Sequence, residues 1–448
     1  MKFNSSRSIV DLKSAFLSDA VSPAQAVEDV LGRIEKSDFN AFIEVDRAGA
    51  TLAAASATLV GQSGGSLGAL HGIPIGVKDV IDVAGMKTTA GSGFLGAEAA
   101  TADALAIRRL RAEGAIIVGK TNVHQFATGA TGDISHFGPV LNPLDRTRVP
   151  GGSSSGSGAA VAAQLCPAAI GTDTGGSVRM PAALCGIVGM KPTYGLVPTE
   201  GVFPLARTLD HVGPMTATVE DNATLLEVLA DRAGHYVSEM RRSPAGMRVG
   251  LLRGYFSNFV EPEIEATLQQ ACELLRKLEV DVVEIAVDEA EEAYHWMQTV
   301  LKAESAALHR KWLDGAKPYA DDVRSRLIGN RNVSADDYLE ALWSRPRARA
   351  IYDKALDGLD LLLSPTCGIF APPQGERNTA LQGNTHPTFW LLARMTGSFN
   401  FSGHPALSLP VMSTSGQSAG LQFIARHYDE ASIYRVAAAL SAELRNPS

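Results

Sequence analysis

Two glycine-rich turns that carry serine enclose one short helix and one short strand near the middle of the chain. They lie at Val149–Gly158 (VPGGSSSGSG) and Gly171–Ser177 (GTDTGGS). Glycine lets the backbone adopt positive φ angles and approach a ligand closely, and serine supplies a hydroxyl that can attack, relay a proton or cap a helix. Such turns can bring two hydroxyls and a row of free backbone N–H groups to one point. The pattern therefore indicates acyl transfer through a serine.

Helical and β-rich segments alternate along the sequence, which predicts a layered α/β fold. Around the two turns, helices are expected at 158–165 and 178–184, with apolar runs typical of buried strands at 168–171 and 187–190. The other expected helices are 9–34 with a second start at Ser22–Pro23, 48–59, 104–113, 264–278, 289–312, 335–356 and 431–444, and the other expected strands are 73–77, 115–118, 247–252, 280–285 and 359–363. A surface loop is expected at 61–68. No repeat or low-complexity linker divides the chain, so we expect one continuous domain with a cover at Gly315–Pro387.

The composition is that of an ordinary globular protein. The 448 residues, 45% hydrophobic and 20% charged, are enough for a large core. A net charge of −8 argues against non-specific binding to nucleic acid. No apolar run approaches the ~18 residues of a membrane helix and no secretory signal is visible, so we expect no membrane association and a cytoplasmic location. The four cysteines form no CxxC pair and are predicted to be reduced thiols; no spacing of ligand residues predicts a metal or cofactor.

The residues of the serine–glycine region leave several functional interpretations open. A solvated linker is disfavoured, because apolar runs flank the region and a small-residue helix follows at once. A phosphate cradle is one alternative, since N–H groups at a helix start attract anions, although the Gly-Lys-Ser/Thr ending of a P-loop is missing. Ser154 satisfies the G-x-S-x-G pattern of a nucleophile elbow, which would need an acid and then a histidine downstream. The remaining interpretation is a serine that uses a lysine as its base.

This last interpretation gains support from motifs along nearly the whole chain, which resembles the amidase signature family. The motifs that carry the resemblance are Gly72–Asp79 (GIPIGVKD), Gly119–Asn122 (GKTN), Asn142–Pro143, Gly151–Ser154 (GGSS), Gly175–Arg179 (GGSVR), Gly189–Gly195 (GMKPTYG), Leu209–Pro214 (LDHVGP), Gly403–Pro410 (GHPALSLP) and Gly420–Gln422 (GLQ). As a joint pattern they are highly specific. The resemblance implies a central twisted mixed β-sheet covered on both faces by α-helices.

In that family a lysine and two serines act together, and the matching positions here are Lys78, Ser153 and Ser177. Ser177 would attack, and Ser153, which lies 24 residues earlier as in the family, would pass the proton to Lys78. The resemblance also implies a cis peptide bond before Ser153. An unperturbed lysine has a pKa of ~10.4, so burial has to lower the pKa of Lys78 by about three units. The adjacent Asp79 is expected to face elsewhere.

The segments around these three residues contain further candidates. The backbone N–H groups expected to form an oxyanion hole are those of Thr174, Gly175, Gly176 and Ser177. The expected supporting residues are Ser154, Asp173 and Arg179, with a substrate-carboxylate clamp as an alternative role for Arg179. The expected substrate-binding residues are Gly129, Ala130, Thr131 and Gly132. Six apolar residues near the end of the cover favour an acyl or aryl group over a highly charged one, unless they only pack the core; they are Phe370, Phe389, Trp390, Met395, Phe399 and Phe401.

We expect a single amidase domain over residues 1–448, with N-terminal helices at 1–64, the signature core at 65–215, a variable helical and cover region at 245–400 and a C-terminal part at 401–448. The expected activity is hydrolysis of a linear carbon–nitrogen bond of a small amide through a serine acyl-enzyme. Anilide, carbamate, urethane and ureido substrates and an esterase side activity are compatible with it. The alternatives are an amidotransferase subunit of the transfer-RNA-dependent type, an α/β-hydrolase-like esterase that uses Ser154, and an inactive relative that binds. We expect a monomer or homodimer with a small-molecule substrate and without nucleic acid, membrane, metal or cofactor.

Overall fold

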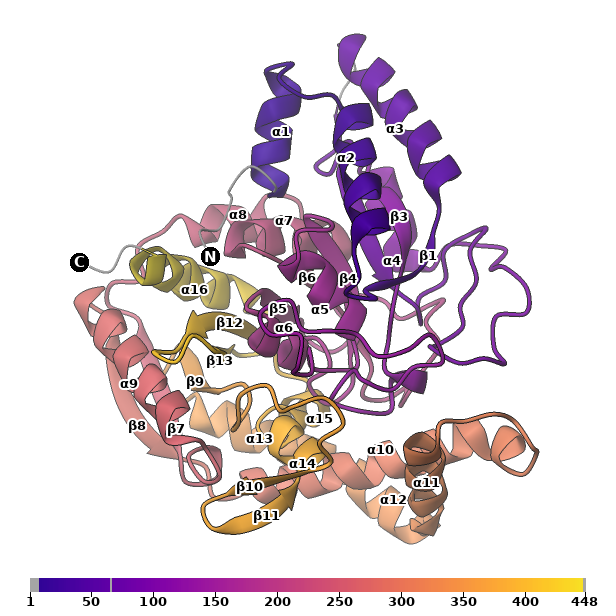
Figure 1. Cartoon of the computed structure of the whole chain (residues 1–448). Helices are drawn as coiled ribbons and strands as arrows, with labels where there is room; N and C mark the ends of the chain where they lie inside the picture. Colours follow the sequence, from indigo (N-terminus) through magenta and orange to yellow (C-terminus); the bar gives the residue numbers. More distant parts are fainter. Residues whose placement is uncertain (1–7, 65–66, 446–448) are drawn as a thin grey trace.

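A large mixed sheet forms the centre of the protein, whose computed structural model describes residues 8–64 and 67–445 (Figure 1). In this part of the chain, strands pair in the order β1-β3-β2-β4-β6-β5-β12-β13-β9-β7-β8. Their bounds are β1 Phe42–Val45, β2 Pro74–Lys78, β3 Ile116–Thr121, β4 Ala168–Asp173, β5 Val188–Lys191, β6 His211–Thr216, β7 Arg248–Arg253, β8 Asp281–Ala286, β9 Leu361–Pro365, β12 Ala406–Met412 and β13 Ser418–Ile424. The α/β class predicted from the sequence is therefore confirmed.

Three neighbouring strands in the first half of the sheet run parallel. β2 lies between β3 and β4 and is parallel to both. The carboxyl ends of these strands therefore meet at one edge of the sheet, the place where open α/β sheets bind their ligands. β2 ends at Lys78 and β4 ends at Asp173. Two of the motif segments identified in the sequence are thus brought to the same edge.

Helices cover both faces of the sheet. Successive side chains along a strand point to opposite faces, and here apolar side chains lie on both faces and have to be buried. Along β3, for example, Ile117 belongs to one hydrophobic core and Ile116 to another. The helices that pack on the core of Ile117 include α1 Ile9–Leu17, α4 Leu105–Ala112, α7 Val219–Ala230, α8 His235–Met240, α9 Pro262–Lys277 and α16 Glu430–Arg445. The helices that pack on the core of Ile116 are α2 Pro23–Lys36, α3 Arg47–Gln62, α5 Ser155–Ala162 and α6 Arg179–Cys185.

A mostly helical region follows β8 and supplies the outer wall of the candidate site. Its elements are α10 Ala290–Leu313, α11 Asp321–Gly329, α12 Ala335–Trp343, α13 Arg345–Ala355, the paired strands β10 Asn378–Leu381 and β11 Asn384–Pro387, α14 Thr388–Ala393 and α15 Gly397–Ser402. A separate hydrophobic core packs α10 against α13 and α15. Figure 1 shows α10 to α12 extending from the body of the molecule at the lower right. None of the helices in the described residues is long and apolar enough to cross a bilayer.

The predicted elements are present with ends shifted by a few residues, apart from one correction. The single helix predicted at 335–356 is wrong: α12 ends at Trp343 and α13 begins at Arg345, because Pro346 lacks the N–H that would continue the first helix and suits the start of a second. The sequence pattern also fails to predict β6, β12 and β13, since glycines and prolines interrupt their apolar runs. At the loop expected for 61–68, α3 continues to Gln62, and residues 65–66 lie outside the described residues.

Candidate active site

Lys78 ends strand β2 with its whole side chain buried. The residue is 0% exposed. Its Nζ lies 2.8 Å from the Ser153 Oγ and 2.7 Å from the Thr172 Oγ1, and 3.3 Å from the carbonyl oxygen of Thr172. Burial lowers the pKa of Lys78 to about 7, against the opposing charges of Asp173 and Asp210. A large fraction of the amine is therefore unprotonated at neutral pH and able to accept a proton.

The carboxylate of the next residue, Asp79, engages Lys120 and not Lys78. Its Oδ1 lies 3.1 Å from the Nζ of Lys120, and both side chains are fully buried. Its Oδ2 accepts hydrogen bonds from the N–H and the hydroxyl of Thr89. Burial raises the pKa of Asp79, while Lys120 and Thr89 act in the opposite direction. Because Lys120 compensates this charge, Asp79 does not oppose the lowered pKa of Lys78.

Ser153 places its buried hydroxyl beside Lys78 from the first serine–glycine turn. The Gly152–Ser153 peptide bond is cis. The Gly152 N–H donates to the carbonyl oxygen of Ala130 at 2.7 Å, and a Cβ on Gly152 would lie 2.9 Å from the carbonyl oxygen of Gly129. Only glycine fits at this close approach. The carbonyl oxygen of Ser153 in turn accepts from the His124 N–H at 3.1 Å, so backbone contacts fix the turn on both sides of the cis bond.

Ser154 is bound to strand β4. Its hydroxyl donates to the carbonyl oxygen of Thr172 at 3.1 Å and lies 3.3 Å from the Thr172 N–H, while its own N–H donates to the carbonyl oxygen of Ser177 at 3.2 Å. Among residues 8–64 and 67–445, no histidine side chain hydrogen-bonds to the hydroxyl of Ser153, Ser154 or Ser177. The geometry therefore does not support the nucleophile-elbow alternative, in which Ser154 needs a histidine partner.

The second serine turn is held by a buried ion pair between Asp173 and Arg179. The Arg179 Nη2 lies 2.9 Å from the Asp173 Oδ1, and both side chains are 0% exposed. The carboxylate also accepts from the N–H groups of Gly176 at 2.7 Å and Val178 at 3.2 Å. Burial alone would raise the pKa of Asp173, but the charge and hydrogen bonds of Arg179 hold it well below its ordinary range. The pair therefore stays charged and shapes the turn around Ser177.

The guanidinium of Arg179 has no donor to spare for a substrate. Besides Asp173, it donates to the Gln422 Oε1 and the Asn400 Oδ1, both at 2.6 Å, and to the carbonyl oxygen of Thr396 at 3.1 Å. Gln422 lies on β13 and Asn400 on α15, far along the sequence. The supporting position of Arg179 is thus the one observed, and the alternative role as a carboxylate clamp is wrong.

The backbone N–H groups of the second turn differ in their availability. The Gly176 N–H donates to the Asp173 carboxylate and is not available to an acyl oxygen, in contrast to the expectation. In the described part of the chain, the N–H groups of Thr174, Gly175 and Ser177 have no protein acceptor. Gly176 itself adopts φ +123°, and a Cβ there would run into Thr396. Three of the four expected donors therefore remain free beside the Ser177 hydroxyl.

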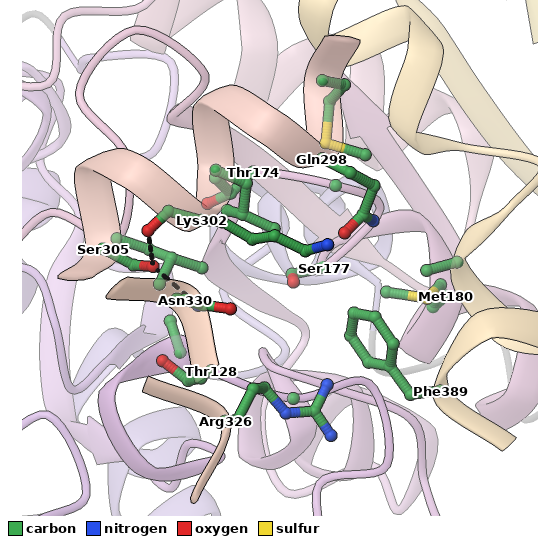
Figure 2. Close-up of a pocket in the computed structure, with 17 residues that line it drawn as sticks. Thr128, Thr174, Ser177, Met180, Gln298, Lys302, Ser305, Arg326, Asn330 and Phe389 are labelled. Atoms are coloured by element: carbon green, nitrogen blue, oxygen red, sulfur yellow. Dashed lines mark hydrogen bonds between the residues drawn. The ribbon is translucent and has the colours of Figure 1, made fainter. Parts of the chain in front are cut away.

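Ser177 lines a cavity of about 110 Å³ between the second turn and the helical cover (Figure 2). The serine is 6% exposed. The other residues that line the cavity are Ala127, Thr128, Gly129, Thr174, Gly175, Met180, Leu205, Met297, Gln298, Leu301, Lys302, Ser305, Arg326, Asn330, Phe389 and Ala393.

The expected substrate-binding segment contributes only Gly129 to this cavity. Ala130 packs in a hydrophobic cluster, the Thr131 hydroxyl donates to Asp133 at 2.6 Å, and the Gly132 N–H donates to the His124 Nδ1 at 3.1 Å. These three positions differ from the expectation, because they make contacts within the protein and do not line this cavity.

The cover contributes polar residues that the sequence motifs do not reveal. They are Gln298 and Lys302 on α10, Arg326 on α11 and Asn330 just after it. Arg326 and Asn330 fall within the cover expected at 315–387, so the only sequence signal for them is their position in that segment. Of the six apolar residues named near its end, only Phe389 lines the cavity; the others pack in the hydrophobic cores.

One group of metal-ligand residue types lies apart from the cavity. Ligand atoms of Asp353, His404 and His427 lie within 4.8 Å of one another. The His404 ring nitrogens contact Asp353 at 3.1 Å and the Ser402 hydroxyl at 3.0 Å, and His427 contacts the carbonyl oxygen of Ser402 at 3.1 Å. The sequence spacing does not reveal this group. None of its members lines the cavity of Ser177, and hydrogen bonds within the protein account for their arrangement.

The mixed sheet with helices on both faces and the cluster at its parallel edge define an enzyme that acts on carbon–nitrogen bonds. The family model described as Amidase matches residues 25–434. The chain therefore belongs to the amidase signature family, as its motifs predicted.

Known relatives resemble the chain over almost its whole length. It is 33% identical over 445 residues to a protein of Koribacter versatilis (strain Ellin345) that is named as one of the subunits of glutamyl-tRNA(Gln) amidotransferase, and the match covers 91% of each chain. Among solved structures, an amidase is similar with a TM-score of 0.91 at 32% identity, covering 98% of this chain and 100% of that one. Another, from work on a vestigial protein complex that reveals the evolutionary origins of an s-triazine catabolic enzyme, has a TM-score of 0.93 at 30% identity, covering 97% and 98%.

Proposed function

We propose that the protein hydrolyses a linear carbon–nitrogen bond of a small amide through an acyl-enzyme on Ser177. The Ser177 oxygen attacks the carbonyl carbon, and its proton passes through the Ser153 hydroxyl to the unprotonated amine of Lys78. When the tetrahedral intermediate collapses, the carbon–nitrogen bond breaks and the leaving nitrogen takes a proton back along the same path. A water molecule then attacks the ester on Ser177 in the same way and releases the acid.

The negative charge that develops on the carbonyl oxygen needs donors that are already in place. The free N–H groups of Thr174, Gly175 and Ser177 are suitable, because the ion pair of Asp173 and Arg179 holds the turn that carries them. Loss of one such donor typically costs ~10²–10³ in rate. This assignment leaves Gly176 out, since its N–H is used within the turn.

The observation that carries the proposal is the contact between Lys78 and Ser153. Their Nζ and Oγ atoms lie 2.8 Å apart in a fully buried site, and burial lowers the pKa of Lys78 to about 7. A serine hydroxyl beside such an amine can receive a proton from a second serine and release its own. The cavity that Ser177 lines gives a substrate carbonyl access to the attacking oxygen.

The test is a panel of matched amides, anilides, carbamates and esters offered to the purified chain, with mass spectrometry of the protein during turnover. The proposal predicts hydrolysis of at least one small amide and an acyl adduct on Ser177. Ser177→Ala is the matched variant and should form no adduct. Hydrolysis that persists in Ser177→Ala, or an adduct on another serine, would overturn the assignment.

A role within an amidotransferase is the second candidate, favoured by the names of the relatives. Proteins named as subunits of glutamyl-tRNA(Gln) amidotransferase are 31–35% identical to the chain over more than nine tenths of its length. In that role the amide cleaved would be glutamine, and the ammonia would pass to a second substrate held by partner subunits. Ammonia release from glutamine that is negligible for the isolated chain and large with such partners would favour this candidate. Efficient turnover of another small amide by the isolated chain would favour hydrolysis.

A further inference from the structure

Two cationic side chains reach the cavity of Ser177 from the helical cover. Lys302 lies on α10 and Arg326 on α11, and both line the same cavity of about 110 Å³ as the serine. Figure 2 shows the two side chains directed from different helices toward the space beside the Ser177 hydroxyl. Two cations at one small cavity repel each other, and a negatively charged group bound between them would remove this repulsion.

The protein supplies little negative charge to these two side chains. The nearest acid to Arg326 is Asp322, one helical turn earlier, at 3.6 Å from the guanidinium. That carboxylate is shared with Arg377, whose Nε lies 3.2 Å from it. Arg377 also holds Asp133 at 2.8 Å. Lys302 has neither a hydrogen bond nor an ion pair through its amine among the described residues. The cluster therefore carries three cations against two carboxylates.

The guanidinium of Arg326 is positioned for a planar anion. Its carbon lies 4.2 Å from the centre of the Phe389 ring, and the side chain is 29% exposed. Stacking on an aromatic face fixes the plane of the guanidinium and leaves the donors at its edge free to bind a carboxylate through two parallel hydrogen bonds. Apart from the ion pair with Asp322, no side chain or backbone oxygen in the described ranges accepts from those donors. Arg326 thus has Asp322 as its one ion-pair partner in the described residues, whereas every donor of Arg179 is used within the supporting network.

The same cavity offers acceptors for an amide nitrogen. The Gln298 Nε2 donates to the Tyr294 hydroxyl at 2.9 Å, and the Asn330 Nδ2 donates to the Ser305 hydroxyl at 3.0 Å. These bonds fix each side-chain amide and leave its oxygen free to accept, as the orientation of Asn330 in Figure 2 illustrates. Donors for a carboxylate and acceptors for an N–H group thus line one space with the attacking serine.

From this arrangement we infer that the substrate is a small amide that carries a carboxylate, such as the monoamide of a short dicarboxylic acid or a ureido acid. Arg326 and Lys302 bind the carboxylate and leave the scissile carbonyl at Ser177. The inference rests on the proposed amide hydrolysis. It also revises the expectation, drawn from apolar residues of the cover, that the substrate is not highly charged.

The test compares succinamate with succinamide, in which a neutral amide replaces the carboxylate. The intact chain should hydrolyse succinamate with a kcat/KM about ten- to a hundredfold higher than succinamide, the range expected for a charged hydrogen-bonded contact. Arg326→Gln and Lys302→Met should each remove most of that preference, because they raise KM for succinamate far more than KM for succinamide. Lys311→Met, at an exposed lysine on the same helix α10, is the matched control and should keep the preference.

A binding measurement separates failure of this inference from failure of the proposed function. In calorimetry with Ser177→Ala, succinate should bind, and Arg326→Gln in that background should weaken binding about tenfold or more. If no amide is hydrolysed but succinate binds through Arg326, the proposed reaction fails and the anion site stands. If succinamide is hydrolysed with the same kcat/KM as succinamate, and succinate does not bind, the inference is overturned while the reaction stands. Because Lys302 is exposed on its helix, we expect Lys302→Met to keep the fold, so this variant tests the anion site independently of Arg326→Gln.

Discussion

Replacing Lys78 by methionine should abolish activity and change the pH dependence of stability in a calculable way. In the folded protein burial lowers the pKa of Lys78 to about 7, from an ordinary value of 10.5. Between these two pH values the unfolded chain holds a proton on this amine that the folded protein does not, so raising the pH favours the folded state. Below pH 7 the full cost of the shift, about 5 kcal/mol, opposes folding. Lys78→Met removes this linkage, because methionine does not titrate.

The expected difference is large enough to measure by urea denaturation. Each pH unit over which the proton numbers differ by one is worth ~1.4 kcal/mol, and the folded amine is half titrated at pH 7, so the wild-type protein should gain about 2 kcal/mol relative to Lys78→Met between pH 7 and pH 9. The unmet hydrogen bonds of Ser153 and Thr172 in the variant add a constant that cancels from this comparison. Lys311→Met, at an exposed position, is the control and should track the wild type. A difference between wild type and Lys78→Met that stays constant within about 0.5 kcal/mol would refute the lowered pKa.

Three further outcomes follow from the site. Ser177→Ala should lower kcat by about 10⁴-fold or more, whereas Ser154→Ala should lose far less, because its hydroxyl only joins the turn to β4; steady-state assays of both variants decide this, and the reverse order would revive Ser154 as the attacking residue. Arg179→Met should reduce the free energy of unfolding by about 3–5 kcal/mol, since it leaves the buried charge of Asp173 unpaired; an unchanged urea midpoint would contradict the structural role of the pair. Prolonged treatment with EDTA should leave kcat unchanged, because the proposed chemistry uses no metal; loss of activity restored by added zinc would contradict it.

The fold class could be predicted because its signals are local. Helical spacing and short apolar runs follow from neighbouring residues, and they predict β2, β3, β4 and the helices around them. Strands β12 and β13 depend on a different kind of information: Pro410 and Gly420 weaken their own strand pattern, and their pairing with β5 and β9 compensates through contacts distant in the sequence. Pro346, by contrast, is a local signal for the break between α12 and α13 that the helical spacing masks.

The candidate site also contains residues that the sequence predicts and residues that only the folded structure reveals. Lys78, Ser153 and Ser177 lie in motif segments, and the parallel edge of the sheet brings those segments together. The cavity wall depends instead on how α10 and α11 pack over the edge, which no motif encodes. Lys302 and Arg326 therefore look like ordinary surface residues of amphipathic helices in the sequence, and only the folded arrangement places them beside Ser177.

The proposed proton path can be tested at its first step by single-turnover acylation of the protein with a small activated amide between pH 5 and pH 9, followed by digestion with trypsin. The peptide Val149–Arg179 contains Ser153, Ser154 and Ser177 together, so fragmentation has to locate the adduct. We expect an acyl group on Ser177 and a rate that rises about tenfold per pH unit before it levels off near pH 7, where Lys78 loses its proton. An adduct on Ser154, or an acylation rate that does not change across this range, would contradict a buried unprotonated lysine that acts through Ser153.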